Sequence, residues 1–145
     1  MRASAPSYIS ALAVAKSEVS MMYKSSISQT EVEDVEMEGA KDVTIQWLLK
    51  KDHGVPNFEM RRFTVKKGGH TPYHQHDFEH EIYVMSGRGV LKHEGEEQPI
   101  HPEDVIYVPS MDWHQFRNTG DADFVFMCLV PVSYTHLTLP TTPYV

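Results

Sequence analysis

Histidines are concentrated in a short stretch of the chain, between residues 70 and 80. His74, His76 and His80 lie close together there, and His114 follows on a distant segment. Neutral imidazole is a common ligand of divalent metals, and a metal site draws ligands from more than one segment. A single histidine is usually solvated or hydrogen-bonded, but three on one face would repel one another once protonated. The sequence therefore predicts one divalent metal ion on these four histidines.

The spacing of the histidines indicates which way their side chains face. Residues of equal parity along a strand point to the same side, so we expect His74 and His76 to share a strand and face inward. His80 and Ile82 keep this parity, which directs Glu81 outward. The sequence thus predicts that His80, and not Glu81, joins the metal site.

Short extended runs separated by turn residues surround the histidines. Alternating apolar residues predict strands that start at Val43 and cover residues 58–65, 81–85, 104–108, 114–118 and 123–130. Lys67-Gly68-Gly69 is predicted to break the second run, and Glu94-Gly95-Glu96 to form a hairpin loop. Sustained helical periodicity is missing from this region of the sequence. The pattern is typical of an all-β sandwich or barrel in a single domain.

The two ends of the chain depart from this pattern. Residues 1–30 are expected to be an N-terminal extension, partly upstream of a natural start at Met21 or Met22, and Glu31–Asp42 a solvated lead-in. The predicted domain covers residues 31–132. Residues 133–145 resemble the translation of a transposase adapter used in preparing DNA libraries. We therefore expect this tail to be non-native and exclude His136 from the site.

Composition narrows the classes of partner. The 145 residues provide one core, and 13 basic against 20 acidic residues give a formal net charge of −7 without a basic stripe. This balance argues against binding to nucleic acid or to anionic membranes. Cys128 is the single cysteine, so a disulfide framework is excluded, and no apolar run approaches the roughly 20 residues that span a bilayer. We expect a cytoplasmic protein that binds a small molecule.

The histidine pattern resembles that of the cupins over about residues 43–132. Seven positions match the two motifs of this family: Gly68, His74, His76, Gly87, Pro109, His114 and Asn118. His80 stands where the family usually has glutamate, and Glu103 replaces the first glycine of the second motif. Because glycines shape turns and do not bind metal, this departure affects loop shape and leaves the ligand set intact.

Within the family, the sequence looks most like small four-histidine cupins that bind manganese. This resemblance implies a double-stranded β-helix, a jelly roll of two packed sheets. It implies manganese as the first choice of metal, with iron, nickel, zinc or copper as alternatives because imidazole accepts all of them. It also implies a homodimer.

A substrate pocket beside the metal follows from parity and resemblance together. Ile82 and Phe116 should line it because they share the parity of the ligands His80 and His114, and the resemblance adds three further residues: Arg61, Phe126 and Cys128. Arg61 would be the cation that holds a carboxylate or enolate oxygen, although its neighbour Arg62 competes for the inward position.

Four neutral imidazoles would leave the metal its full charge and leave coordination positions open. Such a centre suits a bidentate substrate, dioxygen or both. We expect an oxygenase-like enzyme acting on a small organic acid or an unsaturated compound, with Arg61 as the catalytic residue. Metal-assisted isomerase or lyase chemistry is the first alternative, and it would need a base in the cavity. A non-catalytic small-molecule-binding module is the second.

Overall fold

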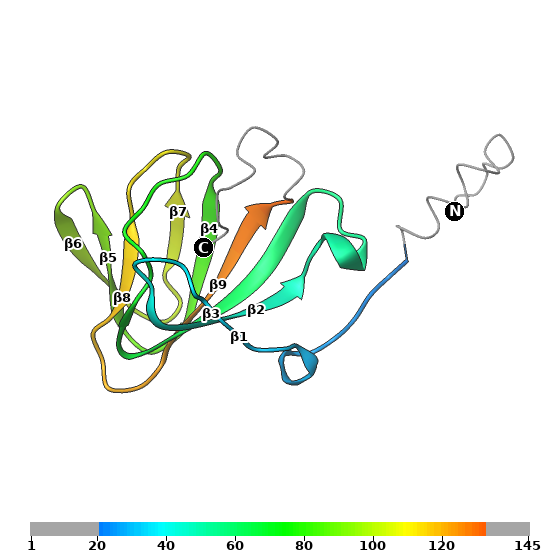
Figure 1. Ribbon diagram of the computed structural model, residues 1–145, viewed down its shortest axis with the longest axis horizontal. Helices are drawn as coiled ribbons and strands as arrows, with labels where there is room; N and C mark the ends of the chain where they lie inside the picture. The colour runs from blue at the N-terminus through cyan, green and yellow to red at the C-terminus, as the bar shows by residue number, and fades with distance from the viewer. Residues whose placement is uncertain (1–20, 133–145) are drawn as a thin grey trace, which may run out of the picture.

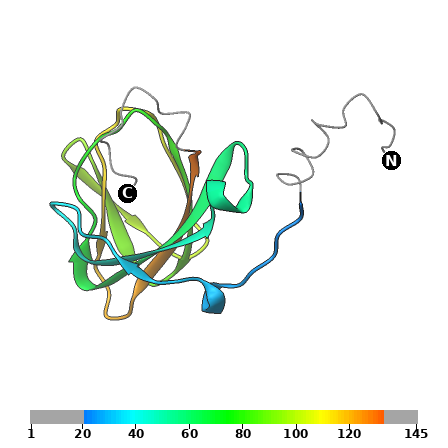
Figure 2. The ribbon, with the colours of Figure 1, turned by 45° about the vertical axis from the view of Figure 1, so that its right-hand side comes forward.

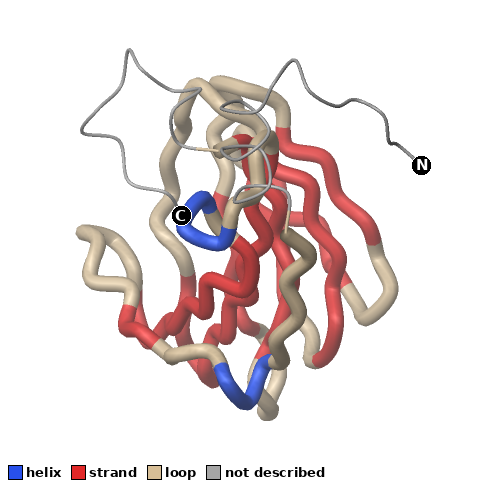
Figure 3. Tube along the Cα trace, turned by 90° about the vertical axis from the view of Figure 1, so that its right-hand side faces the viewer, coloured by secondary structure: helices blue, strands red, loops and turns tan. Residues whose placement is uncertain are grey.

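The computed structural model describes residues 21–132, and within this range the chain is built mainly of strands (Figures 1 and 3). The strands are β1 (Glu33–Asp34), β2 (Lys41–Leu49), β3 (Phe58–His70), β4 (His80–Ser86), β5 (Gly89–His93), β6 (Glu96–Ile100), β7 (Val105–Val108), β8 (Gln115–Asn118) and β9 (Phe124–Pro131). Two short 3-10 helices, η2 (Ile27–Gln29) and η3 (Lys51–His53), flank β2 along the chain. None of the helices in the described part is long and apolar enough to cross a membrane.

The strands form one nine-stranded sheet that curls into an open barrel (Figure 2). The strand order is β6-β5-β8-β3-β9-β4-β7, with β2 and then β1 added on β3. Strand β3 pairs with β9 from Phe58 to Val65 and with β8 at His70, so it joins the two arms of the sheet. The predicted all-β jelly roll is confirmed.

The core lies between the two arms and follows the alternation that the sequence predicts. Along β4, His80 and Ile82 are buried whereas Glu81 is exposed. Three of the buried aromatic rings pack in a row, with ring centroids 5.2 Å apart for Phe63 and Phe126 and 4.9 Å apart for Phe116 and Phe126. Burying such a side chain contributes about 1.5–3 kcal/mol. This packing joins β3, β8 and β9 in the interior of the barrel.

The β5–β6 hairpin confirms one of the predicted turns. Glu94 and Gly95 connect the strands with φ angles of 51° and 82°, the left-handed conformation that a two-residue type I′ turn requires. Glycine adopts this conformation at little cost, which is why the Glu94-Gly95 pair predicts the turn.

The predicted break at Lys67-Gly68-Gly69 is wrong, because β3 continues to His70. The two glycines form an irregular stretch of paired strand: the register with β2 shifts between Lys41 and Val43, and a Cβ at Gly69 would lie 2.5 Å from the carbonyl oxygen of Lys41. Glycine here allows two backbones to approach closely and does not end the strand.

The acidic segment also contains more structure than a solvated lead-in. Glu33 and Asp34 form β1 and pair with Ile45 and Thr44 of β2, because backbone pairing does not depend on the charge of the side chains. Val35 packs against the core. Residues 133–145 and 1–20 lie outside the described range, so the expectations for the tail and for most of the extension remain predictions.

Candidate metal centre

The segment between β3 and β4 carries two of the four candidate histidines, His74 and His76, and it is a loop. His74 forms a single bridge with His114, through hydrogen bonds of 3.1 and 3.0 Å between their backbone groups, and His76 is outside any strand. The expectation that His74 and His76 share a strand is therefore wrong. Pro72 lacks a backbone N–H, which weakens ladder pairing at the start of this segment.

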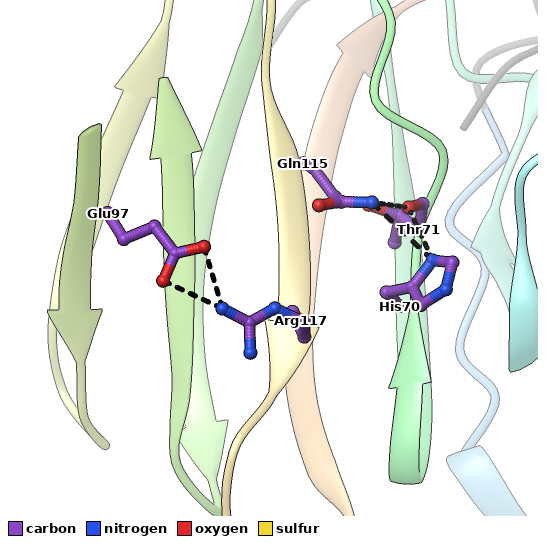
Figure 4. Close-up of polar contacts among 5 residues, drawn as sticks. All are labelled: His70, Thr71, Glu97, Gln115 and Arg117. Atoms are coloured by element: carbon purple, nitrogen blue, oxygen red, sulfur yellow. Dashed lines mark hydrogen bonds and ion pairs between the residues drawn. The ribbon is translucent and has the colours of Figure 1, made fainter. Parts of the chain in front are cut away.

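Side chains of β8 and the loop hold this segment in place (Figure 4). Gln115 donates from Nε2 to the Thr71 carbonyl at 3.0 Å, and the Phe116 N–H donates to Thr71 Oγ1 at 2.9 Å. His70, the last residue of β3, lies 3.5 Å from the same Gln115 nitrogen. These contacts fix the start of the loop against β8 and so set His74 opposite His114.

Figure 4 also shows an ion pair that links β8 to β6. Arg117 of β8 donates from Nη2 to both carboxylate oxygens of Glu97 on β6, each at 2.7 Å. The pair is half-exposed, and an ion pair of this kind contributes about 0–1 kcal/mol.

The structure brings the four candidate histidines together. His74, His76 and His114 each offer a ring nitrogen within 4.8 Å of the others, and His76 and His114 are only 3% and 2% exposed. His80 comes from β4, and its Nε2 lies 2.6 Å from Nε2 of His76. The imidazole rings of all four residues therefore face one small volume inside the barrel.

Backbone carbonyls orient two of these rings. Nδ1 of His76 donates to the Phe78 carbonyl and Nδ1 of His114 to the Asp112 carbonyl, both at 2.8 Å. A carbonyl oxygen only accepts, so each Nδ1 carries the ring proton and each Nε2 keeps a lone pair. Nε2 of His114 is buried and has no hydrogen-bond partner within the described range. A divalent cation fits this donor set, because it would satisfy the buried lone pairs that the fold directs together.

Burial lowers the pKa of three of these imidazoles, those of His76, His80 and His114. It lowers the pKa of His76 from 6.5 to about 3, with His114 and His74 adding to the effect, and it lowers the pKa of His80 well below 6.5, aided by Arg61. The pKa of His114 is also lowered by burial, even though its bond to the Asp112 carbonyl acts in the opposite direction. Neutral imidazole is the form that binds a metal.

Arg61 lies inside the barrel, fully buried, whereas Arg62 donates to Gln46 on the other side of the sheet at 2.8 Å. Nη2 of Arg61 is 2.9 Å from Sγ of Cys128 and 3.4 Å from Nδ1 of His80. The guanidinium also lies over the Phe63 ring, 5.0 Å from its centroid. Arg61 is thus a buried cation beside the ring of His80, on the side of Nδ1.

Side chains nearly fill the space expected for a substrate. A cavity of about 10 Å³, the size of one water molecule, is lined by Phe63, Thr71, His74, His80, His114, Phe116 and Phe126. Phe116 and Phe126 of the expected pocket border this cavity. The other three expected pocket residues, Arg61, Ile82 and Cys128, are buried outside its lining.

His114 also lines a larger groove. It has a volume of about 660 Å³ and lies between the β5–β6 hairpin and β7, with the half-exposed pair His93 and Asp112 in its wall. Sequence reasoning missed this groove, because it forms between two edge strands that only the curling of the sheet brings together. Thr71, Gln115 and Phe78 were missed as well, since Thr71 and Gln115 contribute hydrogen bonds from side chains to backbone groups and Phe78 contributes its backbone carbonyl.

Comparison with known proteins identifies the family. The cupin domain profile matches residues 61–130. An oxalate-binding protein of Thermotoga maritima is 32% identical over 98 residues, which cover 65% of this chain and 80% of that protein. The chain therefore belongs to the cupin superfamily.

Two further relatives indicate how varied these proteins are. The 1-methylthio-D-xylulose 5-phosphate methylsulfurylase of Rhodospirillum rubrum is 32% identical over 83 residues, and the chain spans about half of its length, 53%. The solved structure of the polyketide cyclase RemF from Streptomyces resistomycificus matches with a TM-score of 0.73 at 30% identity, over 77% of this chain and 80% of that chain. Similarity thus defines the family and the fold, and the chemistry has to be argued from the site.

Proposed function

We propose that the chain is a metal-dependent enzyme with oxygenase-like chemistry that acts on a small organic acid or an unsaturated compound. The observation that carries the proposal is the convergence of four imidazoles: ring nitrogens of His74, His76 and His114 lie within 4.8 Å of one another, and Nε2 of His80 lies 2.6 Å from Nε2 of His76. His74, His76, His80 and His114 would hold one divalent ion, manganese first and iron, nickel, zinc or copper as alternatives. When bound, such an ion supplies Lewis acidity and, for manganese or iron, one-electron redox chemistry.

Arg61 is proposed to bind the acidic group of the substrate; because it lies outside the cavity lining in this structure, its guanidinium would have to move from Cys128 and His80 toward the cavity. It is a buried cation next to His80, and a hydrogen bond from a guanidinium to a charged oxygen is worth about 1.5–3 kcal/mol. The rings of Phe116 and Phe126 keep water away from this volume. Because the interior cavity is about the size of one water molecule, an acid of a few heavy atoms would displace fewer side chains than a bulky ligand. Similarity to a protein that binds oxalate supports this size class.

The proposal is tested by metal analysis of the purified full chain together with oxygen-uptake assays. The assay panel contains oxalate, small unsaturated carboxylic acids and phenols. We expect one divalent ion per chain and metal-dependent oxygen consumption with at least one panel member, both lost in His114→Ala. A chain that binds no divalent metal, or a loaded chain that turns over a substrate without consuming oxygen, contradicts the proposal.

Similarity to a polyketide cyclase favours a second candidate, metal-assisted isomerase or lyase chemistry without oxygen. In that reaction the metal would act as a Lewis acid only, and the rate would be the same in air and under anaerobic conditions. Metal-dependent ligand binding without any turnover would instead indicate a binding module.

A further inference from the structure

The ring of His80 is held in a different way from the rings of His76 and His114. In those two residues, Nδ1 donates to a backbone carbonyl at 2.8 Å. Nδ1 of His80 instead faces two side chains, Sγ of Cys128 at 2.8 Å and Nη2 of Arg61 at 3.4 Å. The sulfur thus occupies the place that a carbonyl oxygen takes beside the other two rings.

The chemistry of the three groups decides which of them can serve His80. A neutral imidazole that gives Nε2 to a metal carries its proton on Nδ1, and that N–H needs an acceptor. The guanidinium of Arg61 has donors only, so it cannot accept this proton. The cysteine sulfur can accept, and among the contacts of His80 Nδ1 within the described range it is the one group that does.

The sheet fixes the sulfur in this position. Cys128 on β9 pairs with Arg61 on β3 and with Ile82 on β4, and the three strands lie side by side in Figure 1. His80 lies two residues before Ile82, on the same buried face. Cys128 is completely buried, and Arg61 donates to the same sulfur at 2.9 Å. The sulfur therefore has little freedom to turn away from His80.

We propose that Cys128 is a positioning residue of the metal centre, whose sulfur accepts the Nδ1–H of His80 and thereby directs the Nε2 lone pair of His80 at the metal. This inference rests on the proposed metal site. Groups that hold the second nitrogen of a metal-binding histidine typically change metal affinity by about 10- to 100-fold when they are removed. A purely structural role, as a small apolar residue of the core, would predict no such loss on exchange for valine.

Three variants separate these two roles. Cys128→Val removes the acceptor at similar size, Cys128→Ser keeps an acceptor, and Val130→Ala disturbs packing on the same buried face of β9. Affinity for Mn²⁺ and Zn²⁺ is measured by calorimetry, and folding by circular dichroism. We expect Cys128→Val to bind about 10- to 100-fold more weakly and Cys128→Ser to stay within a few-fold of the parent. Val130→Ala should lower the melting temperature and leave metal affinity unchanged.

A spectroscopic measurement tests the same inference without relying on affinity. Nitrogen NMR of the Zn²⁺-loaded parent should show the His80 proton on Nδ1, and this signal should persist in Cys128→Ser and shift or broaden in Cys128→Val. In a His80→Ala background, Cys128→Val should cause no further loss of affinity.

The possible failures can be told apart. A parent chain that binds neither Mn²⁺ nor Zn²⁺ would contradict the proposed function itself. A parent that binds metal while a folded Cys128→Val binds equally well would overturn the role of Cys128. If Cys128→Val does not fold, the serine variant decides: weak binding with an altered His80 signal also overturns the inference, since serine retains an acceptor.

Discussion

The two halves of the candidate centre are held by different parts of the protein. Backbone carbonyls orient His76 and His114, and a backbone bridge joins His74 to His114. On the other half, the side chains of Arg61 and Cys128 surround His80. A carbonyl cannot be removed by substitution, whereas a side chain can. The first half is therefore built into the fold, and the second half can be tuned residue by residue.

The histidines of the backbone-held half are needed for the site to form at all. Arg61 and Cys128, in contrast, are positions where a substitution would adjust the chemistry of the site. Replacing a histidine of the backbone-held half deletes a proposed ligand, although the backbone groups that oriented its ring remain in place. Changing Arg61 or Cys128 leaves every proposed ligand in place and alters only what surrounds one of them.

The largest expected effect is loss of the metal when the backbone-held half is changed. His76→Ala or His114→Ala should remove stoichiometric metal, because each deletes a buried lone pair whose orientation a carbonyl fixes. Metal content after dialysis, measured by mass spectrometry, checks this. His101→Ala, at a half-exposed residue paired with Asp104, is the matched control and should keep the metal. Retention of full metal by both site variants would show that the site is assigned wrongly.

His80→Ala should weaken metal binding less than the changes at His76 or His114, because the three-histidine cluster remains. We expect a loss of roughly 10- to 100-fold in affinity, about 1.4–2.8 kcal/mol. Glu81→Ala should have no effect, since Glu81 is exposed on the opposite face of β4. Calorimetric titration with Mn²⁺ measures both variants. The reverse result, metal lost in the Glu81 variant and kept in the His80 variant, would exchange their roles.

Acid should destabilise the metal-free protein even before the folded histidines are protonated. The pKa of His76 is about 3 in the folded chain against 6.5 ordinarily, so between these values the unfolded chain binds the proton and the folded chain does not. The contribution of neutral His76 to the free energy of unfolding is therefore fully present above about pH 6.5. It decreases as the pH drops toward about 3, by up to about 1.4 kcal/mol per pH unit.

Urea unfolding of the metal-free chain at several pH values measures this slope. His76→Gln should flatten the slope, because one group that binds a proton on unfolding is removed. An equal slope in the parent and in His76→Gln would show that other groups cause the acid sensitivity.

Arg61→Ala should keep the metal and weaken substrate binding by roughly 10- to 100-fold, because a buried donor for the substrate's acidic group is lost. Arg61→Lys should not restore binding, since the planar fork of donors is missing. KM and kcat on an acid found in the oxygen-uptake screen measure the effect. Arg62→Ala, on the outer face, is the control and should resemble the parent. Full activity in Arg61→Ala would remove Arg61 from the site.

The smallest effect on the centre should come from the outer face of the sheet, where we expect two copies of the chain to pair. Val105 and Tyr107 of the edge strand β7 are 77% and 63% exposed, and Tyr83 of β4 lies beside Val105. Tyr107→Lys should convert a dimer into a monomer without changing metal content, as judged by light scattering. A parent that is monomeric at micromolar concentration contradicts the expected dimer.

Much of this protein could be predicted from its sequence. Strand periodicity and turn residues predict the all-β fold, and parity predicts that His80 and Ile82 are buried while Glu81 is exposed. These predictions succeed because they depend on local geometry, in which side chains alternate along a strand. The two-residue turn at Glu94 and Gly95 is local in the same sense.

Tertiary structure alone decided how the site is held. Strand β3 runs past its glycines, and the loop that carries His74 and His76 is fixed by Thr71 and Gln115 through bonds to β8. Residues far apart in the sequence make these contacts, and no local pattern specifies them. The same holds for Cys128 beside His80, 48 positions apart, because only the pairing of β4 with β9 brings sulfur and imidazole together. Spacing selects the chemical groups, and long-range strand pairing sets their orientation.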